Sequence, residues 1–166
     1  MSAMIKVRLC ETDDLPLLRP NEPHPSARLA DKHLALQEGG DYYFAVAYSG
    51  GRPLGTCVLD VRDPLSPELK NLWVYPEARR MGAGRALTRY LEELAADLGY
   101  EEVFFGVDPD NAEAIPMYVS LDYSPTGNHR TANYTWVDKA GNAHERSQLD
   151  AVYRKSLLAL LLLKCS

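Results

Sequence analysis

The segment "LWVYPEARRMGAGRAL" at 72–87 combines residue types that favour the binding of an anion. Gly82 and Gly84 let the backbone turn tightly and approach a ligand closely, because neither carries a Cβ atom. They precede an amphipathic helix whose first N–H groups have no partner within the helix. Such amides bind phosphate. Three arginines of the segment would add charge-assisted hydrogen bonds: Arg79, Arg80 and Arg85.

The common nucleotide-binding loops do not match this segment. The pattern GxxxxGK[ST] is absent, and GxGxxG fails because Leu87 stands three residues after Gly84. A purely structural interpretation is also open, in which Gly82 eases a strand-to-helix turn and the arginines form a solvated face. The order of strand, arginines, glycines and amphipathic helix favours phosphate binding.

Two motifs in this order resemble the signature of the GCN5-related N-acetyltransferases, the GNAT superfamily. That family has Gln/Arg-x-x-Gly-x-Gly/Ala between a strand and a helix, and here Arg79 begins the corresponding run "RRMGAG". It follows the next strand with Asn-x-x-Ala-x-x-x-Tyr, which is matched by Asn111, Ala114 and Tyr118. The resemblance extends from Tyr43 to Tyr123.

The resemblance implies acetyl-CoA as co-substrate. The backbone of the strand would face the pantetheine arm, and the amides of the loop would surround the pyrophosphate. Asn111 would bond to the pantetheine, although it is also a good N-cap for the following helix. The expected cofactor-binding residues are Leu72, Trp73, Val74, Arg79, Arg80, Met81, Gly82, Ala83, Gly84, Arg85 and Asn111.

The second motif departs from the family pattern at two points. Asp122 and Tyr123 replace the usual Gly-Phe, and we expect Asp122 to tolerate the left-handed conformation that ends the helix. Pro116 falls inside the predicted helix, where it would remove a hydrogen bond and kink the segment. Such a kink would shift Tyr118.

Acetyl transfer requires an amine that loses a proton and a leaving thiolate that gains one. The resemblance implies that Tyr118 is the acid, and the alternative is a core tyrosine. Glu68, which begins the strand "ELKNLWV", is the candidate base, and the alternative is a solvated strand-end carboxylate. Other candidate bases are Asp60, Asp63 and Asp108. The backbone N–H of Val74 would polarise the thioester carbonyl, as family geometry implies.

The remaining pattern predicts the elements that position these groups. The alternating run "IKVRL", a hairpin formed by "YYFAVAY" and "LGTCVLDVR", and a terminal hairpin pairing "YTWV" with "LDAVYR" across "DKAGN" are typical of strands. The helix after the glycine loop carries an apolar face that includes Leu87, Leu91 and Leu98, and Gly99 ends it.

The order of these elements predicts a mixed α/β (α+β) fold with one GNAT-like domain over residues 1–166. We expect a mostly antiparallel twisted sheet of six to seven strands flanked by about four helices. The apolar tail 156–166 would pack on the domain or on a partner.

Composition narrows the function classes. The 166 residues carry a net charge of −5, which argues against a general nucleic-acid binder. The three cysteines have no metal-ligand spacing, so no metal is expected, and they suit a reducing cytoplasm. The N-terminus lacks the apolar core of a signal peptide, and the longest apolar run cannot cross a bilayer. A soluble, cytoplasmic protein with no membrane partner is expected, and the apolar tail suggests a homodimer.

The acceptor is the least defined part of the prediction. Acidic residues near the expected cleft favour a cationic small-molecule amine, and a protein amine or a non-catalytic acyl-CoA sensor stay open. The proline-rich segment 19–33 is expected to shape one wall of the acceptor site. Tyrosines that could line it are Tyr42, Tyr43, Tyr75 and Tyr134. The histidines are expected at the surface: His24, His33, His129 and His144.

Overall fold

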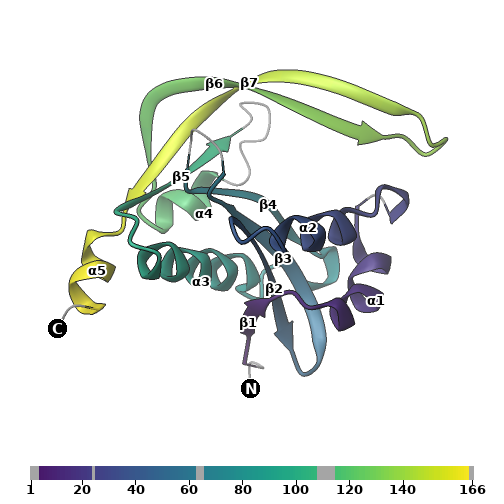
Figure 1. The fold of residues 1–166 in the computed structure, drawn as a ribbon, viewed down its shortest axis with the longest axis horizontal. Helices are drawn as coiled ribbons and strands as arrows, with labels where there is room; N and C mark the ends of the chain where they lie inside the picture. Colours follow the sequence, from purple (N-terminus) through teal and green to yellow (C-terminus); the bar gives the residue numbers. More distant parts are fainter. Residues whose placement is uncertain (1–3, 24, 63–65, 108–114, 165–166) are drawn as a thin grey trace.

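A seven-stranded sheet organises the chain, with strand order β1-β2-β3-β4-β5-β7-β6 (Figure 1). The computed structural model describes residues 4–23, 25–62, 66–107 and 115–164. The strands are β1 (Lys6–Leu9), β2 (Tyr42–Ser49), β3 (Arg52–Asp60), β4 (Glu68–Val74), β5 (Glu102–Val107), β6 (Ser124–Val137) and β7 (Ala143–Ser156). The α-helices are α1 (Leu15–Leu18), α2 (Leu29–Gln37), α3 (Ala83–Asp97), α4 (Ile115–Ser120) and α5 (Leu158–Lys164). Short 3₁₀ turns are η1 (Thr12–Asp14), η2 (Arg19–Asn21), η3 (Pro25–Ala27) and η4 (Pro76–Ala78). The predicted fold class is confirmed, with α5 in the tail as an additional helix.

The sheet opens between its central strands. All neighbouring strands pair antiparallel except β4 and β5. These two strands are parallel, and Glu68 of β4 pairs with Phe104 of β5. Beyond this pair β4 continues to Val74 without a ladder to β5. Its backbone groups on that side are therefore available to a ligand.

A bulge in β4 lies beside this opening. Thr56 pairs with Trp73 and Val58 pairs with Lys70, so β4 carries one more residue than β3 between these pairs. Asn71 within the bulge has a φ of 56°, which is unusual for a residue other than glycine. The bulge changes the direction of β4 where the sheet opens.

Helices pack on both faces of the sheet. His33 of α2 lies against the ring of Phe44, with ring centroids 4.9 Å apart. Leu72 and Val74 instead approach Gly84 at the start of α3. Because side chains alternate along a strand, these contacts define an α2 face and an α3 face.

The apolar stripe of α3 forms much of the core. Leu87, Leu91 and Ala95 are fully buried, as the periodicity predicted. Burial of a leucine contributes roughly 1.5–3 kcal/mol. The prediction was wrong for Leu98, which is exposed because the helix ends one residue earlier. Gly99 adopts a φ of 93° and ends the helix as expected.

The end of α4 accounts for one of the two departures from the family pattern. Asp122 adopts the left-handed conformation with a φ of 73°, and the amide of Tyr123 donates to the carbonyl of Tyr118 at 3.0 Å. Asp122 thus does what a glycine does in the family. The expected kink at Pro116 stays a prediction, because the residues that precede Ile115 lie outside the described part of the chain.

The terminal hairpin is longer than predicted. It turns at Asp138–Asn142, as expected, but "YTWV" pairs with Ala143–Arg146, and Leu149 pairs with Thr131. In Figure 1 the hairpin arches over the α2 face, and β6 contacts η3 there. The tail forms α5, which packs beside α3 and is linked to it by an ion pair between Lys164 and Asp97.

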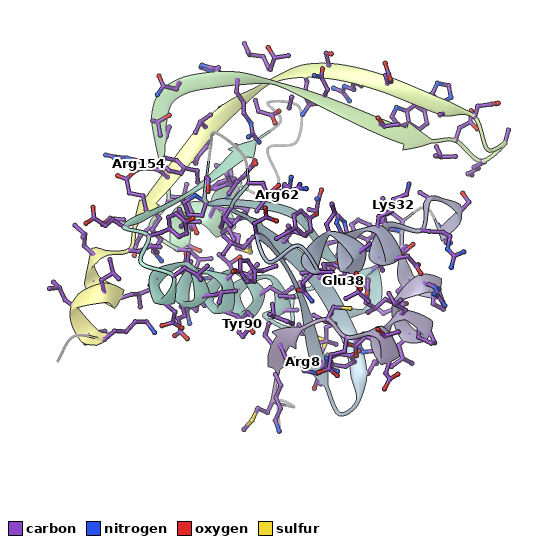
Figure 2. The ribbon with its side chains drawn as sticks, in the orientation of Figure 1. Arg8, Lys32, Glu38, Arg62, Tyr90 and Arg154 are labelled. Carbon is purple, nitrogen blue, oxygen red and sulfur yellow. The ribbon has the colours of Figure 1, made fainter. Side chains whose placement is uncertain are left out.

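A polar cluster joins β1 to the turn before α1, and its Arg8 is labelled in Figure 2. Arg8 makes a two-pronged bond to the Asp14 carboxylate, with both N···O distances 2.7 Å. The Tyr48 hydroxyl and the Glu11 amide also donate to it, at 2.5 and 2.8 Å. Burial opposes ionisation of Asp14, but these hydrogen bonds outweigh it and hold its pKa at about 2.

Asp14→Asn is expected to lower the free energy of unfolding at pH 7 by about 2 kcal/mol. In the wild type the unfolded state binds more protons between about pH 4 and pH 2, so this stabilisation is lost as pH falls through that window. Urea unfolding at pH 7 and pH 3 measures both effects. Exposed Asp13→Asn is the control and should change stability by less than about 0.5 kcal/mol. Equal losses in both variants would contradict the role of the cluster.

Candidate active site

The glycine loop and the end of β4 form a cleft of about 700 Å³ on the α3 face. We call it the arginine cleft. Its lining consists of Leu72, Trp73, Val74, Arg79, Arg80, Gly82, Ala83, Gly84, Arg85 and Met117. Nine of these were predicted to bind the cofactor. Met81, also predicted, is exposed and does not contribute to the lining, and Asn111 lies outside the described residues.

The loop has the geometry of an anion site. Arg80 and Gly82 both adopt positive φ angles, 66° and 93°, which turn the backbone into the start of α3. A Cβ atom on Gly84 would lie 3.1 Å from the Met117 sulfur. This glycine therefore lets α3 approach α4 closely, and the free amides of α3 face the cleft. The residues present fit a pyrophosphate.

Two arginines of the cleft, Arg79 and Arg85, contact only neutral groups of the protein in the interactions that follow. Arg79 lies over the Trp73 ring at 5.3 Å and donates to the Val74 carbonyl at 3.3 Å. Arg85 donates to the Ser120 hydroxyl at 2.7 Å. None of these contacts is with a carboxylate, so the charges remain available to an anionic ligand.

Gly82→Ala is expected to weaken coenzyme A binding about tenfold, since a Cβ at this positive φ costs roughly 1–2 kcal/mol and shifts the loop amides. Titration calorimetry with coenzyme A measures the change. Gly51→Ala is a matched control, because Gly51 also has a positive φ, 79°, but lies in the β2–β3 turn. A variant at Gly82 that binds like the wild type would contradict this use of the loop.

Tyr118 lies behind the cleft, in the core between β5, α3 and α4. Its ring stacks on Phe105 with centroids 3.9 Å apart and meets Tyr123 edge-on at 5.4 Å. The hydroxyl interacts with the side chain of Thr88. Burial raises the pKa of Tyr118 well above its usual range, so the phenol keeps its proton at neutral pH. Its neighbour Met117 lines the cleft, whereas Tyr118 is almost fully buried.

Glu68 stands at the point where β4 and β5 separate. Its carboxylate is 2% exposed and forms an ion pair with Arg130 of β6. Both residues line a polar cleft of about 570 Å³ on the α2 face, together with Lys70, Asn71, Gly106, Thr131, Ala132, Asn133 and Thr135. The alternative of a solvated strand-end carboxylate does not hold, because the long hairpin covers the start of β4.

The other candidate bases are less suited to the role. Asp60 pairs with Lys70 at 2.6 Å and with Arg62 at 3.0 Å. Burial opposes ionisation of Asp60, but these bonds outweigh it and hold its pKa far below the usual range. It is therefore a poor proton acceptor at neutral pH. Asp63 and Asp108 lie outside the described residues.

A third cavity, of about 350 Å³, lies between α1, α2 and the sheet. We call it the aromatic pocket. Phe44, Trp73 and Tyr75 form its aromatic walls, and Glu22 and His33 add polar groups. It shares Leu72 and Trp73 with the arginine cleft and Asn71 with the polar cleft. The three spaces therefore meet at the β4 bulge.

His33 is only half-buried, so the expectation of surface histidines holds in part for it. Its Nδ1 lies 2.6 Å from the Tyr42 hydroxyl, and its ring stacks between α2 and β2. Burial, with Lys70 nearby, lowers its pKa to about 4, so the ring is neutral at pH 7. His129 and His144 are exposed as expected, and His24 lies outside the described residues.

Four tyrosines were predicted as possible lining of the acceptor site, and two of them lie at this pocket. Tyr75 lines it, and Tyr42 contacts its His33. Tyr43 instead donates to the Gly40 carbonyl at 3.2 Å, and the side chain of Tyr134 lies outside the described part.

Comparison with known proteins decides the family. The model of the acetyltransferase (GNAT) family matches residues 8–123, more than half of the chain. The chain belongs to the GNAT family. N-acetyltransferase 8 of Mus musculus is 30% identical over 116 residues, which are 67% of this chain and 50% of that protein. The chain thus spans about half the length of the curated relatives it matches.

Solved GNAT structures share the fold. The ribosomal-protein-S18-alanine N-acetyltransferase of Escherichia coli has a TM-score of 0.67 at 24% identity, covering 93% of this chain and 94% of that one. A spermidine N-acetyltransferase of Vibrio cholerae, solved with CoA and spermine, has a TM-score of 0.66 at 16% identity, covering 93% and 96%. The family prediction is confirmed, and acetyl-CoA is supported as the co-substrate.

Within the described ranges, no three His, Cys, Asp or Glu side chains are grouped so that they could hold a metal ion. No helix in the described part of the chain is long and apolar enough to span a membrane.

Proposed function

We propose that the protein transfers an acetyl group from acetyl-CoA directly to a primary amine of a small molecule. One observation carries this proposal: the arginine cleft on the α3 face and two pockets on the α2 face meet at the bulge where β4 leaves β5. A donor and an acceptor can therefore approach the same point from opposite faces of the sheet. Proximity of this kind supplies a large part of the rate of a two-substrate reaction.

The arginine cleft would hold acetyl-CoA, which when bound supplies an activated acetyl thioester. Loop amides and arginines would bind its pyrophosphate. The free edge of β4 at Leu72–Val74 would pair with the pantetheine arm, and the Val74 amide would donate to the thioester oxygen. Asn111 is proposed to bond to the same arm.

Two side chains are proposed to move protons. Glu68, at the apex of the strand opening, would accept the amine proton directly or through water, while Arg130 holds its carboxylate in place. Tyr118 would donate a hydrogen bond, and then its proton, to the departing sulfur. Because burial makes this phenol a weaker acid than usual, its transfer would accompany cleavage of the C–S bond rather than precede it.

A thiol-release assay with acetyl-CoA and a panel of amino acids, polyamines, aminoglycosides and peptides tests the proposal. We expect release of coenzyme A with at least one small amine, and a matching mass increase in that amine. Thermal stabilisation by coenzyme A without turnover of any amine would indicate that the protein is a non-catalytic acyl-CoA sensor.

A protein amine is the second candidate acceptor. Thr131, Asn133 and Thr135 alternate along β6 and line the polar cleft, an arrangement that suits the main chain of an extended peptide. Faster turnover of peptides than of every small amine in the same assay would favour this candidate.

We also propose that residues 1–166 form a single domain. Two copies of the chain would form a homodimer in the cytoplasm. The leucines of α5 support the dimer, since Leu158 and Leu162 are 51% and 72% exposed. Cys10 and Cys57 are buried free thiols, which suits a reducing compartment. Light scattering that gives the mass of one chain would overturn the dimer.

A further inference from the structure

Glu22 contributes a carboxylate to the wall of the aromatic pocket. It follows η2, and its Oε1 accepts a hydrogen bond from the Ala30 amide in the first turn of α2, at 2.7 Å. The second oxygen, Oε2, is buried and has no hydrogen-bond partner among the described residues. The Leu29 amide also stabilises this carboxylate, so the unsatisfied part of Glu22 is the single atom Oε2.

No nearby cation neutralises Glu22 by a direct bond in the described structure. Arg19 forms its ion pair with Asp31 at 2.7 Å, and Lys70 forms its pair with Asp60. His33 is neutral at pH 7. Glu22 is therefore the only carboxylic acid in the described pocket lining.

The helix cap alone does not account for a glutamate at this position. Capping uses one side-chain oxygen, which an amide side chain also offers. Burial raises the pKa of Glu22, which shows that the pocket disfavours its charge. An unsatisfied buried acceptor destabilises the folded protein, and a cation entering the pocket would recover this free energy.

We propose that the aromatic pocket binds an ammonium group, with Glu22 as its anion. Phe44, Trp73 and Tyr75 also line the pocket, and aromatic rings favour a cation beside them. A rotation about the terminal torsion of Glu22, which is soft, brings Oε2 to the ligand.

The ammonium group held at Glu22 is not the amine that accepts the acetyl group. The attacking nitrogen must lose its proton, and the proposed base, Glu68, lines the polar cleft and not this pocket. The acceptor class is therefore a diamine, with one ammonium in the aromatic pocket and a second amine at the β4 bulge. The choice of reacting amine rests on the proposed acetyl transfer, but the binding of the cation does not.

Calorimetry on protein saturated with coenzyme A, which carries no acetyl group, tests binding without turnover. We expect 1,5-diaminopentane to bind at least tenfold more tightly than pentan-1-amine. Glu22→Gln keeps the cap and removes the charge, so it should abolish this preference. Glu38→Gln, at the other end of α2 (Figure 2), is the matched control and should retain it.

Equal binding of the two amines to the wild type, or an unchanged preference in Glu22→Gln, would overturn the inference. If Glu22→Gln melts early, Glu22→Asp provides a second variant, which keeps the charge and should retain part of the preference. Thiol release with acetyl-CoA separates the two proposals. A diamine preference without thiol release refutes the acetyl transfer alone, and turnover without any diamine preference refutes the ammonium site alone.

Discussion

Tyr118→Phe is expected to lower kcat for acetyl transfer about 100-fold or more and to leave the affinity for coenzyme A within about threefold. The variant keeps the ring that stacks on Phe105 and removes the hydroxyl that would protonate the departing sulfur. Steady-state kinetics with saturating acetyl-CoA and calorimetry with coenzyme A measure the two quantities.

Tyr123→Phe is the matched control for this substitution. Tyr123 belongs to the same aromatic cluster, but its hydroxyl donates to Glu92 at 2.7 Å within the core. We expect it to lower stability by roughly 1–2 kcal/mol and kcat by less than threefold. If Tyr118→Phe behaves like this control, Tyr118 is a packing residue and the acid lies elsewhere.

Glu68→Gln is expected to lower kcat/KM about 100-fold, because an amide cannot accept the amine proton. Gln retains an oxygen for the Arg130 guanidinium, so the hairpin should stay in place. The same kinetic assay measures the loss, and circular dichroism checks the fold.

Asp60→Asn is the control for a buried carboxylate on the same face. Its ion pairs with Lys70 and Arg62 are structural, so the variant should lose stability while keeping kcat/KM within about threefold. A Glu68→Gln variant as active as the wild type would contradict the assignment of the base.

The local sequence pattern was sufficient to predict the strands and the helix that form the proposed cofactor site. The bounds of β4 and β5 agree with the runs "ELKNLWV" and "EVFFGV", and Gly99 ends α3 as its conformation allows. These features depend on alternation, helical periodicity and backbone preference within a few residues. For the same reason the left-handed end at Asp122 could be predicted.

The acceptor face could not be predicted in this way, because its residues meet through tertiary contacts. Glu68 and Arg130 are 62 residues apart and pair across a hairpin whose length gave no sequence signal. His33 has a polar surrounding in the sequence, and its burial becomes visible only when α2 lies on β2. The unsatisfied Oε2 of Glu22 becomes apparent only in the folded chain, where the Ala30 amide donates its hydrogen bond to Oε1.

Initial rates over a matrix of acetyl-CoA and amine concentrations test the central claim most directly. If donor and acceptor occupy opposite faces of the β4–β5 opening together, the acetyl group passes between them in a ternary complex. Double-reciprocal plots at fixed amine concentrations should then intersect. Parallel lines, with an acetylated protein detected by mass spectrometry when acetyl-CoA is added alone, would indicate a covalent enzyme intermediate and contradict direct transfer.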